Sequence, residues 1–135
     1  MKKIYKIRGH HIGPFVGLVE LKLKVNPIYD KEEDYINFLS STGKYTKNDA
    51  KGFLNLAEKI LKDKGSSKLK ITTAEDEICD VCKSHKDSCS KLESEDEETI
   101  KEYNIDKDKE YTIDELITIA REYRKKKGYI FNKKR

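Results

Sequence analysis

The stretch that decides the fold is TKNDAKGFLNLAEKILKDKG, residues 46–65. Thr46 followed three residues later by Asp49 resembles a capping box, in which two side chains bond the free backbone N–H groups of a helix start. Gly65 is typical of a helix end. Apolar residues in steps of three and four predict one buried helix face of about four turns: Ala50, Phe53, Leu54, Ala57, Ile60 and Leu61.

Short strands are predicted on both sides of this helix. Residues 2–8 alternate loosely between apolar and basic side chains, and Leu69 and Ile71 alternate with lysines. Alternation with a period of two is typical of a strand with one buried face. We expect the N-terminal strand to pack beside residues 68–72.

The most apolar stretch, Pro14 to Val25, predicts a further helix. Proline suits the first turn of a helix, so the helix is expected to start near Pro14. Residues 21–25 alternate as in a strand, which is the competing interpretation. Asn26-Pro27 is expected to close this element.

Three more helices complete the predicted set. Each is inferred from a polar residue that precedes a glutamate by three positions, the pattern of an N-terminal cap. The expected caps are Asp30 with Glu33, Ser94 with Glu97, and Thr112 with Glu115; the expected ends of the first and last helix are Gly43 and Gly128.

These elements predict an α+β fold, in which a small sheet of few strands packs with three to four amphipathic helices. The length of 135 residues fits one domain, which we place at 1–124, with a cysteine-bearing loop and a basic C-terminal tail at 125–135. Charged residues make up 40% of the chain, against about 25% in an average domain. The core is therefore expected to be lean.

Composition also excludes several classes of protein. No run approaches the roughly 20 apolar residues that span a bilayer, and no apolar segment of a signal peptide follows the basic N-terminus. Three cysteines are an odd and small number, unlike a disulfide framework. These features predict a cytoplasmic protein with reduced thiols and no membrane contact.

The strongest chemical signal is Cys79-Asp-Val-Cys82-Lys-Ser-His85-Lys-Asp-Ser-Cys89. All three cysteines of the chain lie within eleven residues, among charged and polar neighbours. A two-residue spacer lets two thiolates face one centre, and soft thiolates suit zinc or iron–sulfur clusters. The spacing therefore predicts a metal site formed by these three cysteines.

A histidine is needed to complete four ligands. His85 lies between the last two cysteines and offers a local Cys₃His set. His10 and His11 follow Arg8-Gly9 at the expected turn from strand to helix, a place where functional residues collect. All three histidines remain candidate ligands.

Other interpretations of the cysteines stay open. Cys79 and Cys82 are compatible with a redox pair, but the segment 73–78 before them contains three acidic residues, which would raise a thiol pKa. The cysteines also fit unligated side chains. A nucleophilic Cys–His pair lacks an orienting third residue, and no catalytic motif is found. The sequence therefore leaves an enzymatic role open and favours a protein that is not an enzyme.

Four motifs in order resemble one family of short prokaryotic proteins. They are Arg8-Gly-His-His11, Gly43-Lys-Tyr45-Thr46, Asp76-Glu-Ile-Cys79, and the Cys-x-x-Cys…Cys that ends at Cys89. The family is catalogued as domain of unknown function 1284 and is suggested to bind iron–sulfur clusters. The resemblance covers about residues 4 to 120.

The resemblance implies a metal or cluster role for the three cysteines, a cofactor-binding role for Arg8 and a role for His10 and His11. Many relatives resemble Arg-Gly-His-His-x-x-Cys, whereas this chain has Pro14 at the last place, and residues 121–135 lack the cysteines that relatives often carry there. If the relatives' cysteine at the place of Pro14 is a ligand, a histidine must replace it or the cluster is lost.

Acidic and basic residues are concentrated in different parts of the chain, although the net charge is only +4. Residues 93–115 carry a net charge of −8 and residues 121–135 a net charge of +7. The basic end predicts phosphate contacts with stacking aromatic residues, as in a nucleic-acid-binding module, or a solvated tail. The tail residues at issue are Arg121, Arg124, Lys125, Lys126, Lys127, Lys133, Lys134 and Arg135, with Tyr123, Tyr129 and Phe131.

The sequence thus favours a small metal-binding protein that holds zinc or an iron–sulfur cluster, two options that it does not separate. A cluster would point to a redox or protein partner. The alternatives are a nucleic-acid-binding module that uses the basic tail, and a metal-free structural or interaction protein.

Overall fold

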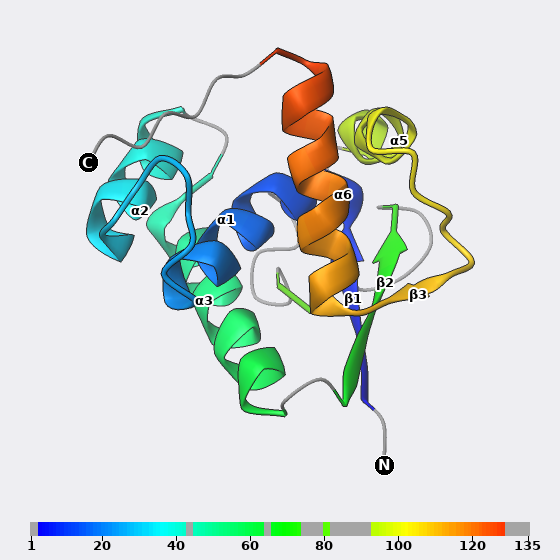
Figure 1. The fold of residues 1–135 in the computed structure, drawn as a ribbon, viewed down its shortest axis with the longest axis horizontal. Helices are drawn as coiled ribbons and strands as arrows, with labels where there is room; N and C mark the ends of the chain where they lie inside the picture. The colour runs from blue at the N-terminus through cyan, green and yellow to red at the C-terminus, as the bar shows by residue number, and fades with distance from the viewer. Residues whose placement is uncertain (1–2, 43–44, 64–65, 74–79, 82–92, 129–135) are drawn as a thin grey trace.

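The computed structural model describes residues 3–42, 45–63, 66–73, 80–81 and 93–128 (Figure 1). Helices and a small sheet make up an α+β fold, as predicted. In the described part of the chain, no helix combines the length and apolar character needed to cross a membrane. The elements are β1 (Lys3–Arg8), η1 (Gly9–His11), α1 (Ile12–Lys22), α2 (Glu32–Ser41), α3 (Lys47–Lys62), β2 (Ser67–Thr72), α5 (Glu93–Glu102), β3 (Glu110–Tyr111) and α6 (Ile113–Lys126).

The sheet has the order β1-β2-β3. β1 and β2 are parallel, with Ile7 opposite Ile71 and Arg8 opposite Thr72. The predicted packing of the N-terminal strand beside residues 68–72 is therefore confirmed. β3 pairs antiparallel with β2 through only two residues, which is too short to leave an alternating pattern, so the sequence did not indicate it.

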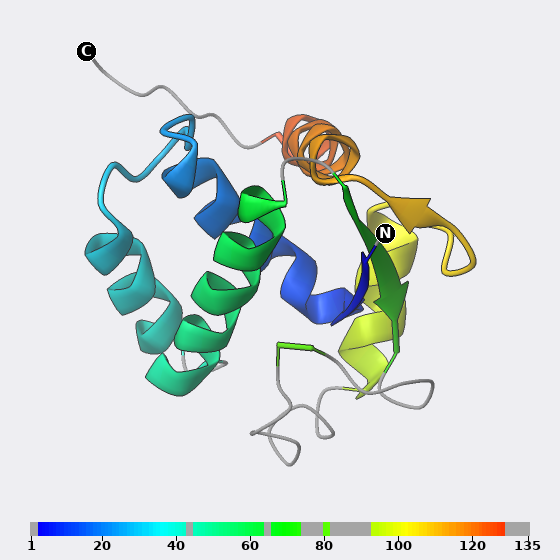
Figure 2. The same cartoon turned by 90° about the horizontal axis from the view of Figure 1, so that it is seen from below.

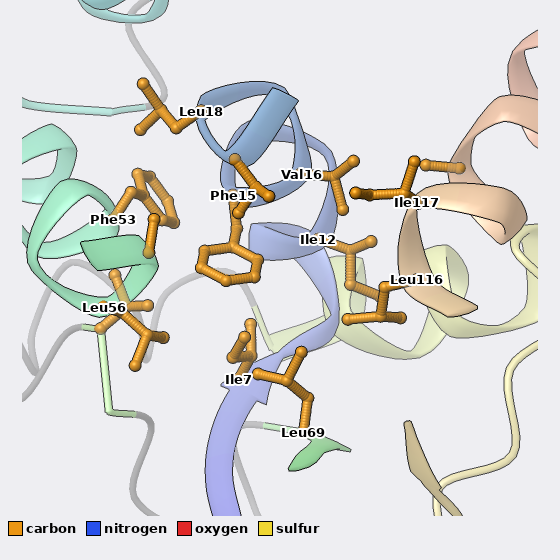
Figure 3. Packing of buried hydrophobic residues seen from close by; sticks show 14 of the residues in the cluster. Ile7, Ile12, Phe15, Val16, Leu18, Phe53, Leu56, Leu69, Leu116 and Ile117 are labelled. Atoms are coloured by element: carbon orange, nitrogen blue, oxygen red, sulfur yellow. The ribbon is translucent and has the colours of Figure 1, made fainter. Parts of the chain in front are cut away.

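The core is built around α1. Its side chains are buried almost all round, which is typical of a helix in a protein interior. α2 and α3 pack on one side of α1 and α6 on another, while β1 and β2 lie beside its N-terminal end (Figures 1 and 2). Figure 3 shows α1 side chains between Phe53 and Leu56 of α3 and Leu116 and Ile117 of α6, with Ile7 and Leu69 of the strands close by.

Two of the predicted helix starts are confirmed in detail. Thr46 and Asp49 form a full capping box at α3, and Thr112 and Glu115 form another at α6. Gly128 follows the C-cap of α6 with φ of 80°, the left-handed conformation that glycine adopts most easily.

The predicted caps of the other two short helices are wrong. α2 has Lys31 at its N-cap without a side-chain bond, and three acidic residues in the first turn complement the helix dipole instead of Asp30. Ser94 lies inside α5, which already includes Glu93. Gly43, the predicted end of α2, lies outside the described residues.

α1 begins at Ile12, two residues before the predicted start. Pro14 still lies in the first turn, where a missing N–H leaves no helical hydrogen bond unmade. The strand interpretation of residues 21–25 is wrong, because α1 runs to Lys22 and Lys24 then adopts φ of 62°. Buried Asn26 fixes the following turn by accepting from the N–H groups of Ile28 and Tyr29 and donating to the Gly17 carbonyl.

α6 is attached to α1 by a buried carboxylate. Glu20 on α1 is fully buried, and its oxygens accept from Arg124 at 2.8 and 3.1 Å and from Arg121 Nε at 3.2 Å. Hydrogen bonds to charged groups are roughly twice as strong as neutral ones. Arg121 and Arg124, which the sequence suggested for phosphate contacts, thus hold the fold together.

Replacing Glu20 with Gln tests this attachment. Loss of the charge weakens three hydrogen bonds, and we expect the free energy of unfolding to fall by about 1.5–3 kcal/mol. The matched control is Glu58→Gln, because Glu58 is exposed and bonds Lys22 at the surface, where an ion pair contributes less than about 1 kcal/mol. Urea denaturation of both variants measures the difference, and equal losses would contradict the assignment.

Candidate functional site

Three of the predicted site residues, Arg8, His10 and His11, lie together at one edge of the sheet. β1 and β2 are parallel, so their carboxyl ends lie at the same edge, where Arg8 is opposite Thr72. β1 leads directly into η1 with His10 and His11, and β2 leads through buried Thr73 into the segment that carries the cysteines. The carboxyl edge of parallel strands is where ligands commonly bind in sheets of this kind.

A buried carboxylate of α5 organises this edge. Asp96 is fully buried and accepts from the backbone N–H of His10 at 3.0 Å. The same oxygen forms a short contact with Nδ1 of His10, and the other oxygen lies 3.9 Å from Nη1 of Arg8. A buried carboxylate requires such partners, because taking a charge out of water is costly.

Close backbone contact places α5 against η1. A Cβ atom on Gly9 would lie 2.4 Å from the backbone carbonyl oxygen of Asp96, closer than atoms can approach. Glycine at position 9 therefore permits the close packing of α5 that places Asp96 beside His10. Figure 2 shows α5 lying along the strands at this side of the molecule.

The His10 ring is held in a defined orientation. Because Asp96 contacts Nδ1, Nε2 is the ring nitrogen that remains for a ligand. Tyr45 donates from its hydroxyl to the His10 carbonyl at 2.8 Å, and its ring is stacked 6.3 Å from the His10 ring with an angle of 18° between them. The carboxylate and the tyrosine together limit the movement of this histidine.

His11 has different surroundings. It is 1% exposed, and its ring meets Phe53 edge to face at a centroid distance of 4.9 Å. The ring also lies 4.2 Å from that of His10. Packing of this kind makes His11 part of the aromatic core beside α3.

The two residues between the first two cysteines are anchored to β1 and α3. Asp80 forms a pair of hydrogen bonds with Lys6: its backbone N–H donates to the Lys6 carbonyl at 2.7 Å, and its carboxylate accepts from the Lys6 N–H at 2.6 Å. Val81 is buried, and a Cβ on Gly52 would lie 2.6 Å from its carbonyl oxygen. The chain on either side of Asp80 and Val81 carries Cys79 and Cys82.

α3 therefore contacts both the histidine turn and Val81. Gly52 lies against the backbone carbonyl of Val81, and the ring of the next residue, Phe53, contacts the ring of His11. Arg8, His10 and His11 come together as a cluster, while Cys79, Cys82, His85 and Cys89 lie outside the described residues. Within the part of the chain that the structure describes, no group of three His, Cys, Asp or Glu residues is arranged to hold a metal ion.

Sequence reasoning missed Asp96. It is one of eleven acidic residues between positions 93 and 115, and no local pattern separates the one that packing buries. Its oxygen Oδ2 and the hydroxyl of Thr72 are both buried without a hydrogen bond to a described residue. Buried polar atoms of this kind commonly indicate a functional site or an additional bound group.

Part of the described basic end is engaged within the protein, and Lys125 and Lys126 are exposed. Tyr123 stacks on Tyr103 at 4.2 Å, and Lys127 pairs with Glu102 at 3.5 Å. Lys125 and Lys126 belong to α6. The remaining predicted tail residues, at 129–135, lie outside the described residues.

Replacing Gly9 with Ala tests the contact between η1 and α5. The added methyl group overlaps the Asp96 carbonyl, and overpacking of this type lowers the free energy of unfolding by about 1–3 kcal/mol. Gly13→Ala is the matched control, because the nearest atom there is the end of the Tyr103 side chain at 3.3 Å. Thermal unfolding of both variants is the measurement; a stable Gly9→Ala protein would contradict the contact.

Comparison with protein-family models places the chain in a family. No curated protein and no solved structure matches the chain. A family model described as "Protein of unknown function (DUF1284)" matches residues 45–132, which are 88 of the 135 residues. The match includes α3, β2, the cysteine segment, α5 and α6, and it excludes Arg8, His10 and His11. Because the match covers more than half of the sequence, the chain belongs to this family of proteins of unknown function.

Proposed function

We propose that this protein binds a metal ion or an iron–sulfur cluster through the thiolates of Cys79, Cys82 and Cys89 and through Nε2 of His10. The observation that carries the proposal is the contact of buried Asp96 with Nδ1 of His10. Metal-binding histidines almost always bond their second nitrogen to a carboxylate, carbonyl or water, which fixes the ring and raises its basicity. The contact at Nδ1 orients the His10 ring so that Nε2 is the nitrogen proposed as the ligand.

The described residues next to the cysteines in sequence support the same site. Thr73 follows β2 at the edge where His10 follows β1, and Asp80 and Val81 contact β1 and α3. A Cys-x-x-Cys pair whose two central residues are anchored has less conformational freedom to lose when it binds. Thiolates need a reducing compartment, so we place the protein in the cytoplasm.

His10 is a better candidate than His11 for the fourth ligand. The reason is the carboxylate at Nδ1 of His10, the arrangement that is typical of a metal-binding histidine. His85, inside the cysteine segment, is the local alternative. A zinc ion would supply folding energy to this segment, and a cluster would supply electron transfer or sensing.

Anaerobic purification with metal and sulfide analysis tests the proposal. We expect either about one zinc per chain, or iron with sulfide and visible absorption from thiolate-bound iron. Cys82→Ser should lose the metal and lower the thermal midpoint, and chelation should lower the midpoint of the wild type to the same value. A wild-type protein that holds neither zinc nor iron, and unfolds at the same temperature as Cys82→Ser, would reject metal binding.

Two histidine variants identify the fourth ligand. His10→Gln should lower metal occupancy or shift the visible spectrum, while His85→Gln, the matched control, should retain both. Asp96→Asn keeps the size of the side chain but removes its charge, and loss of such a supporting partner lowers metal affinity about 10- to 100-fold. Competition with a chromophoric chelator measures each affinity, and loss of metal in His85→Gln alone would move the ligand role to His85.

A further inference from the structure

A groove with tyrosines in its walls shares Tyr45 with the His10 cluster. It has a volume of about 650 Å³ and lies between α1, α2 and α6. Small-molecule sites commonly have volumes of about 300–1,000 Å³. Five of the eight tyrosines of the chain line it: Tyr29, Tyr35, Tyr45, Tyr103 and Tyr123.

Two glycines of α1 bring the tyrosines onto the helix backbone. A Cβ on Gly17 would lie 2.2 Å from the Tyr35 hydroxyl, and one on Gly13 would lie 3.3 Å from the Tyr103 hydroxyl. The positions are four residues apart, so they share one face of α1. The base of the groove therefore combines bare helix backbone with phenol groups.

The groove carries no net charge on its described lining. Among the described lining residues, Arg124 is the charged one. Its Nη2 lies 2.8 Å from Oε1 of the fully buried Glu20, whose carboxylate neutralises the charge. Burial raises the pKa of the Tyr35 and Tyr45 phenols above the ordinary value, so both stay protonated. A lining of this kind attracts neither anions nor cations.

The rim and the base offer complementary contacts. Phe38 and Ile28 line the groove and are 47% and 54% exposed, so a bound apolar molecule would remove their surface from water. The Tyr35 hydroxyl lies 3.5 Å from the carbonyls of both Gly13 and Pro14. Hydrogen bonds at this length are weak, so the hydroxyl can turn and donate to a ligand.

We propose that this groove binds a flat, uncharged ring compound with a hydrogen-bond acceptor such as a carbonyl oxygen. The rings of Tyr29, Tyr35 and Phe38 lie within 5.3 to 6.4 Å of one another and provide stacking surfaces. Tyr35 provides the donor. The inference goes beyond metal binding, since none of these groups is a metal ligand.

Fluorescence titration of the full-length protein with Nile red, an uncharged flat dye with a carbonyl oxygen, tests the proposal. We expect saturable binding of one dye per chain with blue-shifted emission. Phe38→Ala should weaken the affinity about three- to tenfold, in line with the loss of one aromatic contact, and Ile28→Ala should also weaken it. Ile4→Ala is the matched control, because Ile4 is a similarly exposed side chain on β1.

Several results would overturn the proposal. They are absence of dye binding, affinity unchanged in both Phe38→Ala and Ile28→Ala, or equal binding of an anionic dye such as anilinonaphthalene sulfonate. Dye binding that disappears as the protein concentration rises, with a dimer in sedimentation, would assign the groove to a second copy of the chain. The titration can be run on the metal-free protein, so a failed titration and a failed metal analysis are separate results.

Discussion

The parallel pairing of β1 and β2 is the constraint on which the rest of the structure depends. Parallel strands need a long crossover between them, because a tight turn joins only antiparallel strands. The chain between Arg8 and Ser67 provides α1, α2 and α3 for this purpose. The pairing also places the carboxyl ends of both strands at the same edge, where the histidine turn follows β1 and buried Thr73 follows β2. The position of His10 and His11 therefore follows from the fold.

Two buried carboxylates attach the later helices to this framework. Asp96 joins α5 to η1 through His10 and Arg8, and Glu20 joins α1 to α6 through Arg121 and Arg124. These charged hydrogen bonds act in addition to the apolar contacts of the same helices, such as those of Ile100 on α5 and Leu116 on α6. Removing one partner of such a pair is costly, because it leaves a buried charge.

The sequence was informative where structure depends on near neighbours. The capping boxes at Thr46 and Thr112 use residues three positions apart, and both were predicted correctly. Ser94 has the same pattern but lies within α5. Acidic residues are so frequent in this segment that a glutamate three positions after Ser94 does not indicate a cap. The pairing of β1 with β2 followed from the alternation of both segments.

Most of the candidate site depends on contacts distant in sequence. Arg8, His10 and His11 were selected from the sequence and do form a cluster. Asp96 is 86 residues from His10, and its role is visible only after α5 packs on η1. The arginines predicted to bind phosphate instead bond Glu20, and the sequence did not indicate this for the same reason.

Tyr45 connects the charged cluster with the neutral groove. It precedes the cap of α3, so the capping box at Thr46 and Asp49 fixes its backbone. Its hydroxyl holds the carbonyl of His10 while its ring lines the groove. A ligand that displaces the Tyr45 ring would therefore act on the orientation of His10, and a group bound to His10 would act on the groove. The two sites can be energetically coupled through this one side chain, and any such coupling must be equal in both directions.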